Sequence, residues 1–133
     1  MSLIRVGTTY IPVRNVAESL NWYVEKLSAV KTYEDDRKAI INLADQSFFL
    51  VKADEGETAN FKDSEGNEQF SLTFEVDGYD KLAELHKEFA RKEIRVGEIE
   101  DRGHAGNNFV FYDLDGNKFD VWSELSVGFK ENT

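Results

Sequence analysis

The stretch from residue 107 to residue 122 constrains the fold of this chain more than any other. Two runs rich in aromatic and β-branched residues, 108–112 and 118–122, flank the sequence Asp113-Leu-Asp-Gly-Asn117. Such residues favour strands, and Gly and Asn tolerate the positive φ angles of a tight turn. The stretch therefore predicts a β-hairpin. Its glycine comes too early for a calcium loop, and no acidic residue closes a twelve-residue loop, so we interpret the turn as structural.

The second strand of this hairpin alternates between two kinds of residue. Phe119 and Val121 point to one face, whereas Lys118, Asp120 and Trp122 point to the other. This pattern predicts a sheet with a packed apolar face and a second face that carries function. Asp120 is the first candidate for a functional side chain.

Composition restricts the class of protein. The 133 residues suffice for one domain that spans 1–133, and the absence of cysteine excludes disulfides and thiolate metal sites. No apolar run of membrane-spanning length and no signal-peptide pattern are present, which predicts a cytoplasmic protein without a membrane partner. The net charge of −10 disfavours nucleic acid as a partner. It indicates solubility or attraction of a cationic ligand.

The first part of the chain, module one at residues 4–53, predicts the order strand, helix, strand, strand, strand. Residues 5–13 alternate as a strand, in which Pro12 belongs near the end or on a sheet edge. A helix follows over about 16–27, with Asn15 and Glu18 as a capping pair. Three short strands are expected at 30–34, 38–43 and 47–52.

The same order returns after an acidic, Gly-containing segment at 54–68 that predicts an exposed linker. Module two, residues 69–125, begins with a strand at 69–76. A helix opened by Asp77 and Asp80 comes next, and strands are expected at 94–99, 108–112 and 118–124. Residues 126–133 form a C-terminal tail. The chain thus predicts an α+β fold of two βαβββ modules.

Burial of the apolar sheet faces decides the expected architecture. Each helix covers the apolar face of its own sheet, and the two mixed faces then surround a shared concave surface. We expect a cupped, incompletely closed mixed β-sheet barrel with helices on the outside and a cleft between the modules.

Two segments resemble a known superfamily. The segment 10–27, Tyr-Ile-Pro-Val-Arg-Asn-Val-Ala-Glu-Ser-Leu-Asn-Trp-Tyr-Val-Glu-Lys-Leu, is similar to the opening of vicinal oxygen chelate proteins, which include glyoxalases, extradiol dioxygenases and bleomycin and fosfomycin resistance proteins. The segment 111–117 resembles their closing Phe-x-Asp-Pro-Asp-Gly-Asn, with Leu114 in place of proline. The resemblance implies the paired βαβββ fold, and it says less about chemistry, because this fold carries several activities.

The resemblance also implies where a metal would bind. The metal enzymes of the superfamily place one ligand on the first and one on the last strand of each module. These positions fall on Thr8, Leu50 (or Phe49 in the other register), Ser71 and Asp120. One carboxylate with two hydroxyls and an alkyl group would hold a divalent ion feebly. We therefore expect no cofactor and a character closest to the metal-free bleomycin-resistance-like members.

Imidazole is available only from His86 and His104. His86 lies in the predicted outer helix, which favours a packed or solvated helix residue. His104 lies in the loop before the hairpin, where it could border the cleft and contact a ligand or a metal.

The candidate ligand-binding residues are those predicted to face the cleft, together with His104: Thr8, Tyr10, Phe48, Leu50, Ser71, Thr73, Glu75, His104, Asp120 and Trp122. Trp122 and Tyr10 either offer flat surfaces to an aromatic or cationic ligand or fill the space between the modules. Asp120 either lies near Glu75, where one carboxyl could act as a general base, or forms a surface pair with Lys118 or Arg95.

Three hypotheses for function follow. The first is a metal-free protein that binds a small, aromatic or cationic molecule in the cleft. The second is a divalent-metal-dependent lyase or dioxygenase of the glyoxalase type that uses Asp120 and His104. The third is a scaffold that acts through association, and the sheet edges of each module predict a homodimer in any case.

Overall fold

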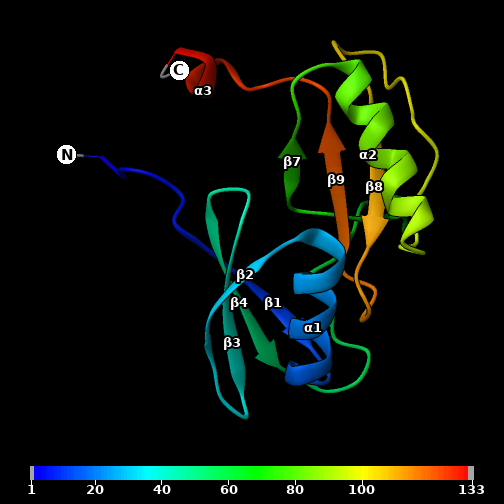
Figure 1. Cartoon of the computed structure of the whole chain (residues 1–133). Coiled ribbons are helices and arrows are strands. Elements are labelled where there is room, and N and C mark those ends of the chain that lie inside the picture. The colour runs from blue at the N-terminus through cyan, green and yellow to red at the C-terminus, as the bar shows by residue number, and fades with distance from the viewer. Residues whose placement is uncertain (1, 132–133) are drawn as a thin grey trace. The chain divides into compact units, whose positions relative to one another are not determined.

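The computed structural model describes residues 2–131 and divides into two compact units, one before and one after residue 58 (Figure 1). Helices and mixed sheets alternate along the chain, which confirms the predicted α+β class. Within the described residues, none of the sheets closes into a barrel. The cup and the cleft shared by the two modules stay predictions. Between residues 2 and 131, none of the helices has the length and apolar character needed to cross a membrane.

The first unit is the predicted βαβββ module. It contains β1 (Thr8–Val13), α1 (Val16–Leu27), β2 (Val30–Glu34), β3 (Lys38–Leu43) and β4 (Gln46–Lys52). The sheet order is β1-β4-β3-β2, with β1 parallel to β4 and the other pairs antiparallel. Pro12 lies on the edge strand β1, as predicted, because an edge strand leaves room for a residue that donates no hydrogen bond.

The core of the first unit lies between its sheet and α1. The side chain of Asn15 accepts the N–H of Glu18 at 2.9 Å, which caps the start of α1, and the helix ends at Ser28 in the left-handed region. One face of the sheet and one face of α1 are almost fully buried, through Ile11, Val13, Leu20, Tyr23, Ala39, Ile41, Phe48 and Leu50.

The second unit is less regular than predicted. Its elements are β5 (Phe61–Lys62), β6 (Glu68–Gln69), β7 (Thr73–Glu75), α2 (Tyr79–Arg91), β8 (Asn108–Tyr112), β9 (Lys118–Trp122) and α3 (Val127–Glu131). The main sheet has the order β7-β9-β8, with β7 parallel to β9. β5 and β6 form a short hairpin in and just after the predicted linker, and α3 lies in the predicted tail.

The predicted strand at 94–99 is wrong as a regular strand. This segment does run along β8, but it makes only two isolated bridges, Val96 with Phe111 and Glu100 with Asn108. Between the two bridges, three residues (97–99) on one side oppose two (109–110) on the other, so an extra residue interrupts the ladder. The bulge explains why a strand-like sequence does not form a continuous third partner for the sheet.

The apolar face of the second sheet packs against α2. Phe89 of α2 lies edge-on to Phe109 and Phe111, with ring centroids 6.0 and 5.0 Å away. His86 also packs on this side, with its ring 5.0 Å from Phe109 and its Nε2 2.8 Å from the carbonyl oxygen of Gly97. The prediction of a packed helix residue is confirmed for His86. The helix is capped at Gly78 without a side-chain hydrogen bond, so the predicted cap at Asp77 is wrong.

Two turns of the second unit repeat one structure. Residues 63–67 and 113–117 both read Asp-x-acid-Gly-Asn. In each turn, the aspartate Oδ1 accepts the N–H groups of the residues two and four positions later. Gly66 and Gly116 adopt φ angles of 83° and 84°, which only glycine adopts without strain. The hairpin predicted from residues 107–122 is confirmed, with β8 and β9 on either side of the second turn.

Candidate functional site

The face of the β7-β9-β8 sheet opposite α2 carries the candidate site, which we call the polar face. Phe119 and Val121 of β9 point into the apolar core, and Asp120 and Trp122 alternate with them, as predicted. Thr73 of β7 and Asn108 of β8 lie on the two neighbouring strands. Asp120 is only 2% exposed. A buried carboxylate needs partners, and those partners define the site.

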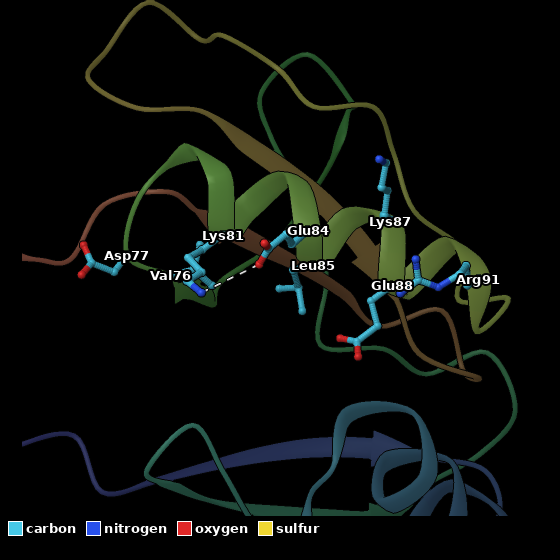
Figure 2. Close-up of a pocket in the computed structure, with 8 residues that line it drawn as sticks. All are labelled: Val76, Asp77, Lys81, Glu84, Leu85, Lys87, Glu88 and Arg91. Atoms are coloured by element: carbon cyan, nitrogen blue, oxygen red, sulfur yellow. Dashed lines mark ion pairs between the residues drawn. The ribbon is translucent and has the colours of Figure 1, made fainter.

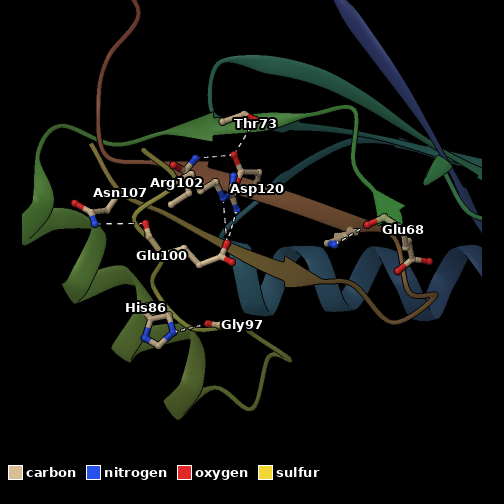
Figure 3. Close-up of polar contacts among 10 residues, drawn as sticks. Glu68, Thr73, His86, Gly97, Glu100, Arg102, Asn107 and Asp120 are labelled. Atoms are coloured by element: carbon tan, nitrogen blue, oxygen red, sulfur yellow. Dashed lines mark hydrogen bonds and ion pairs between the residues drawn. The ribbon is translucent and has the colours of Figure 1, made fainter. Parts of the chain in front are cut away.

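Both oxygens of Asp120 have partners from within the second unit (Figure 3). Oδ2 accepts hydrogen bonds from Thr73 Oγ1 at 3.0 Å and from Asn108 Nδ2 at 2.9 Å. Oδ1 lies 3.1 Å from Nη2 of Arg102, an ion pair that lacks hydrogen-bond geometry. The side chain of Asp120 is therefore held from three sides.

Arg102 reaches Asp120 from the loop before β8. Its Nε and Nη2 both donate to Oε1 of Glu100, at 3.1 and 2.9 Å, and its guanidinium lies 5.7 Å from the ring of Phe70. The backbone of Glu100 is paired with that of Asn108 in both directions, at 2.7 and 3.0 Å. Sequence reasoning missed Arg102 and Asn108. The alternation of residues along β8 could have indicated that Asn108 lies on the same face as Asp120. Arg102 could not be found in this way, because it lies in an irregular loop without periodicity.

Two acceptor atoms at the centre of this cluster make no hydrogen bond. They are Oδ1 of Asn108 and Oδ1 of Asp120, both fully buried. The amide of Asn108 cannot be turned round to relieve this, because its Nδ2 is needed by the carboxylate of Asp120. A buried acceptor without a donor costs about 1–3 kcal/mol, so these two atoms are the polar groups of the cluster whose hydrogen bonds the chain itself does not supply.

Trp122 and His104 meet at one end of the polar face. The indole Nε1 of Trp122 donates to the carbonyl oxygen of Ala105 at 2.9 Å, and the His104 ring lies edge-on at 6.1 Å. The loop approaches closely because Gly106 has no side chain: a Cβ there would lie 2.8 Å from Trp122 Nε1. The predicted neighbourhood of His104, Asp120 and Trp122 is thus partly formed, with Arg102 rather than His104 touching Asp120.

The other predicted residues of this unit lie elsewhere. Both oxygens of Glu75 accept hydrogen bonds from Ser126, from its N–H at 2.9 Å and from its hydroxyl, so the carboxylate is held by the segment before α3. Ser71 is exposed and precedes β7, and the residue in register with Asp120 is Thr73. The predicted pairing of Asp120 with Lys118 or Arg95 is also wrong: Lys118 Nζ donates to the carbonyl of Glu68, and Arg95 stacks on Tyr112.

In the first unit, the side of the sheet expected for the candidate residues is wrong for β4, and the cleft expected beside β1 stays a prediction. Thr8 and Tyr10 lie on the exposed side of β1, away from α1. Their neighbour on β4 is Phe49, whose ring centroid is 4.9 Å from that of Tyr10. Phe48 and Leu50 are 1% and 0% exposed and face the core, because Leu50 is in register with buried Ile11. The last-strand position of this unit therefore follows the Phe49 register.

A groove along α2 is a concave feature of the second unit (Figure 2). Its charged residues balance, with Lys81, Lys87 and Arg91 against Asp77, Glu84 and Glu88, and Val76 and Leu85 supply its apolar atoms. The Lys81–Glu84 pair spans 3.8 Å and is largely exposed. Exposed pairs of this kind are screened and weak, so the groove offers no converging chemistry.

Comparison with known proteins identifies the family. A family model described as the Glyoxalase/Bleomycin resistance protein/Dioxygenase superfamily matches residues 5–121. The chain belongs to this superfamily. No curated protein matches the sequence.

Solved structures of the superfamily share the fold. Lactoylglutathione lyase from Agrobacterium tumefaciens is 15% identical with a TM-score of 0.71, covering 89% of this chain and 92% of that one. The fosfomycin resistance protein FosX from Listeria monocytogenes is 11% identical with a TM-score of 0.75, covering 96% and 98%. A glyoxylase/bleomycin resistance protein/dioxygenase domain from Frankia sp. EAN1pec is 22% identical with a TM-score of 0.70, covering 93% and 100%.

The residues at the superfamily's metal positions do not fit a divalent ion. Thr8 and Ser71 offer neutral hydroxyls, and Phe49 and Leu50 offer no donor at all. Asp120 is the one carboxylate, and the guanidinium of Arg102 lies against its Oδ1. Among residues 2–131, no group of three or more His, Cys, Asp or Glu side chains is placed to hold a metal.

Proposed function

We propose that this protein binds a small organic molecule on the polar face of the β7-β9-β8 sheet, without using a divalent ion. The observation that carries the proposal is the pair of buried acceptors, Asn108 Oδ1 and Asp120 Oδ1, which lack hydrogen bonds. A donor group of the ligand would satisfy them and offset the cost of their burial. We propose binding rather than catalysis, because the side chains of the cluster are engaged in hydrogen bonds and ion pairs with one another.

The charges around the cluster favour a cationic or donor-rich head group. Asp120, Glu100 and Asp101 carry negative charge, and Arg102 is the positive residue among them. The acidic surplus attracts cations, and the chain as a whole carries a net charge of −10. Trp122 offers an aromatic face beside the acceptors, which suits an aromatic ring or an ammonium group.

The alternative, a metal-dependent lyase or dioxygenase, finds less support. It requires His104 and Asp120 to share an ion. His104 Nδ1 instead lies 2.8 Å from the carbonyl oxygen of Ala105, and its ring rests edge-on against Trp122. Metal analysis of protein purified without chelator tests this alternative, and a stoichiometric transition metal would favour it over our proposal.

The test of the proposal follows the fluorescence of Trp122. The variant Trp22→Phe removes the other tryptophan, which lies in α1 of the first unit. Aromatic amines and the matched aromatic carboxylates, such as benzylamine and benzoate, are titrated into this variant after chelator treatment. We expect a saturable response to amines, a much weaker one to carboxylates, and loss of the amine response in Asp120→Asn.

The matched control is Glu84→Gln, which removes an exposed carboxylate from α2 on the opposite side of the sheet. It makes the net charge less negative by the same one unit as Asp120→Asn, so it separates local recognition from general attraction of cations. An equal loss of response in both variants, or no saturable response across a broad panel of amines, would count against the proposal.

We also propose that the protein is a cytoplasmic homodimer. The edge strands β1 and β7 are each hydrogen bonded to a strand on one side only within their own sheets. Such edges favour association with a second copy. Light scattering of the purified protein measures the mass, and a mass of one chain at micromolar concentration would contradict the dimer.

A further inference from the structure

The cluster around Asp120 forms a closed circuit of contacts. Asp120 accepts from the side chain of Asn108, and the backbone of Asn108 is paired with Glu100. Glu100 accepts two N–H groups of Arg102, and Arg102 returns to Asp120 at 3.1 Å. Each member is therefore positioned by two others. Only 27% of the Arg102 side chain is exposed, so it is largely packed against the cluster.

The two carboxylate oxygens of Asp120 differ in their interactions. Oδ2 is occupied by the donors of Thr73 and Asn108. Oδ1 accepts no hydrogen bond and is the atom that a metal ion would use, and the guanidinium of Arg102 lies against it. A divalent cation at this oxygen would meet the guanidinium at close range in a poorly solvated place, with twice the repulsion that a singly charged ammonium group meets, and is therefore disfavoured.

We infer that Arg102 is a tethered counter-ion that takes the place of the superfamily's divalent ion at Asp120, and that its positive charge keeps hard cations away from this carboxylate. The inference deepens the proposed metal-free binding and rests on it. Without the guanidinium, Oδ1 of Asp120 on β9 and Oδ1 of Asn108 on β8 remain side by side, because Asn108 Nδ2 still donates to Asp120, and the backbone of Glu100 stays paired with that of Asn108. Carboxylate and amide oxygens are the ligands that Mn²⁺, Mg²⁺ and Ca²⁺ prefer.

The experiment measures Mn²⁺ binding by the loss of the free-ion electron paramagnetic resonance signal. The wild type is compared with Arg102→Met, which keeps the length of the side chain without its charge, and with Arg102→Lys, which keeps the charge. We expect Arg102→Met to bind one Mn²⁺ per chain about tenfold more tightly than wild type, and Arg102→Lys to match the wild type. The gain should vanish in the double variant Arg102→Met/Asp120→Asn.

Folding is checked by near-ultraviolet circular dichroism, and Arg102→Gln provides a second neutral variant if Arg102→Met does not fold. A folded neutral variant without tighter Mn²⁺ binding would overturn the inference. The wild type supplies an independent test by nuclear magnetic resonance. In the wild type, the Trp22 indole signal serves as the internal reference for the Trp122 indole signal. Broadening of the Trp122 signal alone by Mn²⁺ would also overturn the inference if Asp120→Asn abolished that broadening.

The two proposals fail in different ways. Failure of a folded neutral variant to gain Mn²⁺ removes the role of Arg102 as the excluding cation and leaves the amine titration untouched. A flat amine titration removes the proposed ligand class and leaves the Mn²⁺ comparison between the variants intact.

Discussion

The side-chain oxygen of Asn117 accepts the backbone N–H of Ala59 at 2.8 Å, although 58 positions separate the two residues. The amide nitrogen of Asn117 donates to Oδ2 of Asp113 at 2.8 Å, and the side chain is fully buried. The neighbouring Asn60 accepts the N–H of Lys118 and donates to the carbonyl of Gly116. The turn between β8 and β9 thus anchors the start of the second unit.

Asn117→Ala is expected to destabilise the protein by about 2–4 kcal/mol, because it leaves the N–H of Ala59 and one oxygen of Asp113 without these partners in a buried place. Urea unfolding followed by circular dichroism measures the loss.

The second copy of this turn provides the control for that substitution. Asn67 occupies the same position in the turn at 63–67, but it is exposed. Asn67→Ala should therefore cost less than about 1 kcal/mol, as surface substitutions usually do. Equal losses in the two variants would show that burial is not the source of the effect.

Local patterns predicted the regular elements well, because the residues that determine them are close in sequence. The capping pair at Asn15 and the apolar spacing located α1, and alternation located β8 and β9. The bulge at 96–100 and the β5-β6 hairpin were missed, since both depend on pairing partners that a local pattern does not contain. On β4 the register differs by one residue from the expected one, so Phe48 and Leu50, which were expected to face the cleft, lie in the core.

The candidate site was predictable only in part for the same reason. Alternation on β9 placed Asp120 and Trp122 on one face, and this was correct. The charged partner of Asp120 is Arg102, which an irregular loop and the hydrogen bonds to Glu100 position, so no spacing rule points to it. One of the two interpretations of Asp120 placed it near Glu75, yet the carboxylate of Glu75 accepts hydrogen bonds from Ser126, which lies beyond the last strand.

Arg102→Met should lower the free energy of unfolding more than Asp120→Asn does. Arg102→Met leaves the buried carboxylate of Asp120 without its counter-ion, which costs about 2–4 kcal/mol for a partly exposed partner. Asp120→Asn leaves Arg102 paired with Glu100 and should cost about 1 kcal/mol. The double variant should recover part of the loss, as measured by a urea-unfolding double-mutant cycle.

The reference for an ordinary ion pair is Lys81→Met. The Lys81–Glu84 pair spans 3.8 Å on the surface of α2, and such pairs contribute about 0–1 kcal/mol. If Arg102→Met costs no more than Lys81→Met, the pair with Asp120 is not the buried interaction that we describe.

The loop that carries Arg102 and His104 should be sensitive to Gly106 and much less sensitive to Gly103. Both glycines adopt positive φ, at 76° and 88°, so alanine at either position costs about 1 kcal/mol of backbone strain. A Cβ on Gly106 would also lie 2.7 Å from Ser123 Oγ, whereas one on Gly103 meets nothing within 4 Å. Gly106→Ala should therefore shift the Trp122 emission in the Trp22→Phe background, and Gly103→Ala should leave it unchanged.

The carboxyl groups of Asp35, which is exposed, and Asp63, which is half-buried, should make stability depend on pH in the acid range. The hydrogen bond from the Tyr33 hydroxyl, together with the N–H of Arg37, lowers the pKa of Asp35 below its ordinary value of 3.8. The hydrogen bonds from the side chain of Gln69 and the N–H of Asn67 lower the pKa of Asp63 in the same way. The contribution of these two carboxylates to the free energy of unfolding is fully present above pH 3.8, their ordinary pKa. It is lost as the pH falls through their lower pKa values in the folded protein, because the unfolded state binds more protons in this range.

Thermal unfolding between pH 2 and pH 5 measures this dependence. We expect Asp35→Asn and Asp63→Asn each to flatten the acid limb of the melting temperature, whereas Asp36→Asn, an exposed neighbour, controls for the loss of a charge. Carbon-13 titration of the carboxyl groups reports each pKa directly. A value at or above 3.8 for either residue in the folded protein would contradict the hydrogen bonding described for its turn.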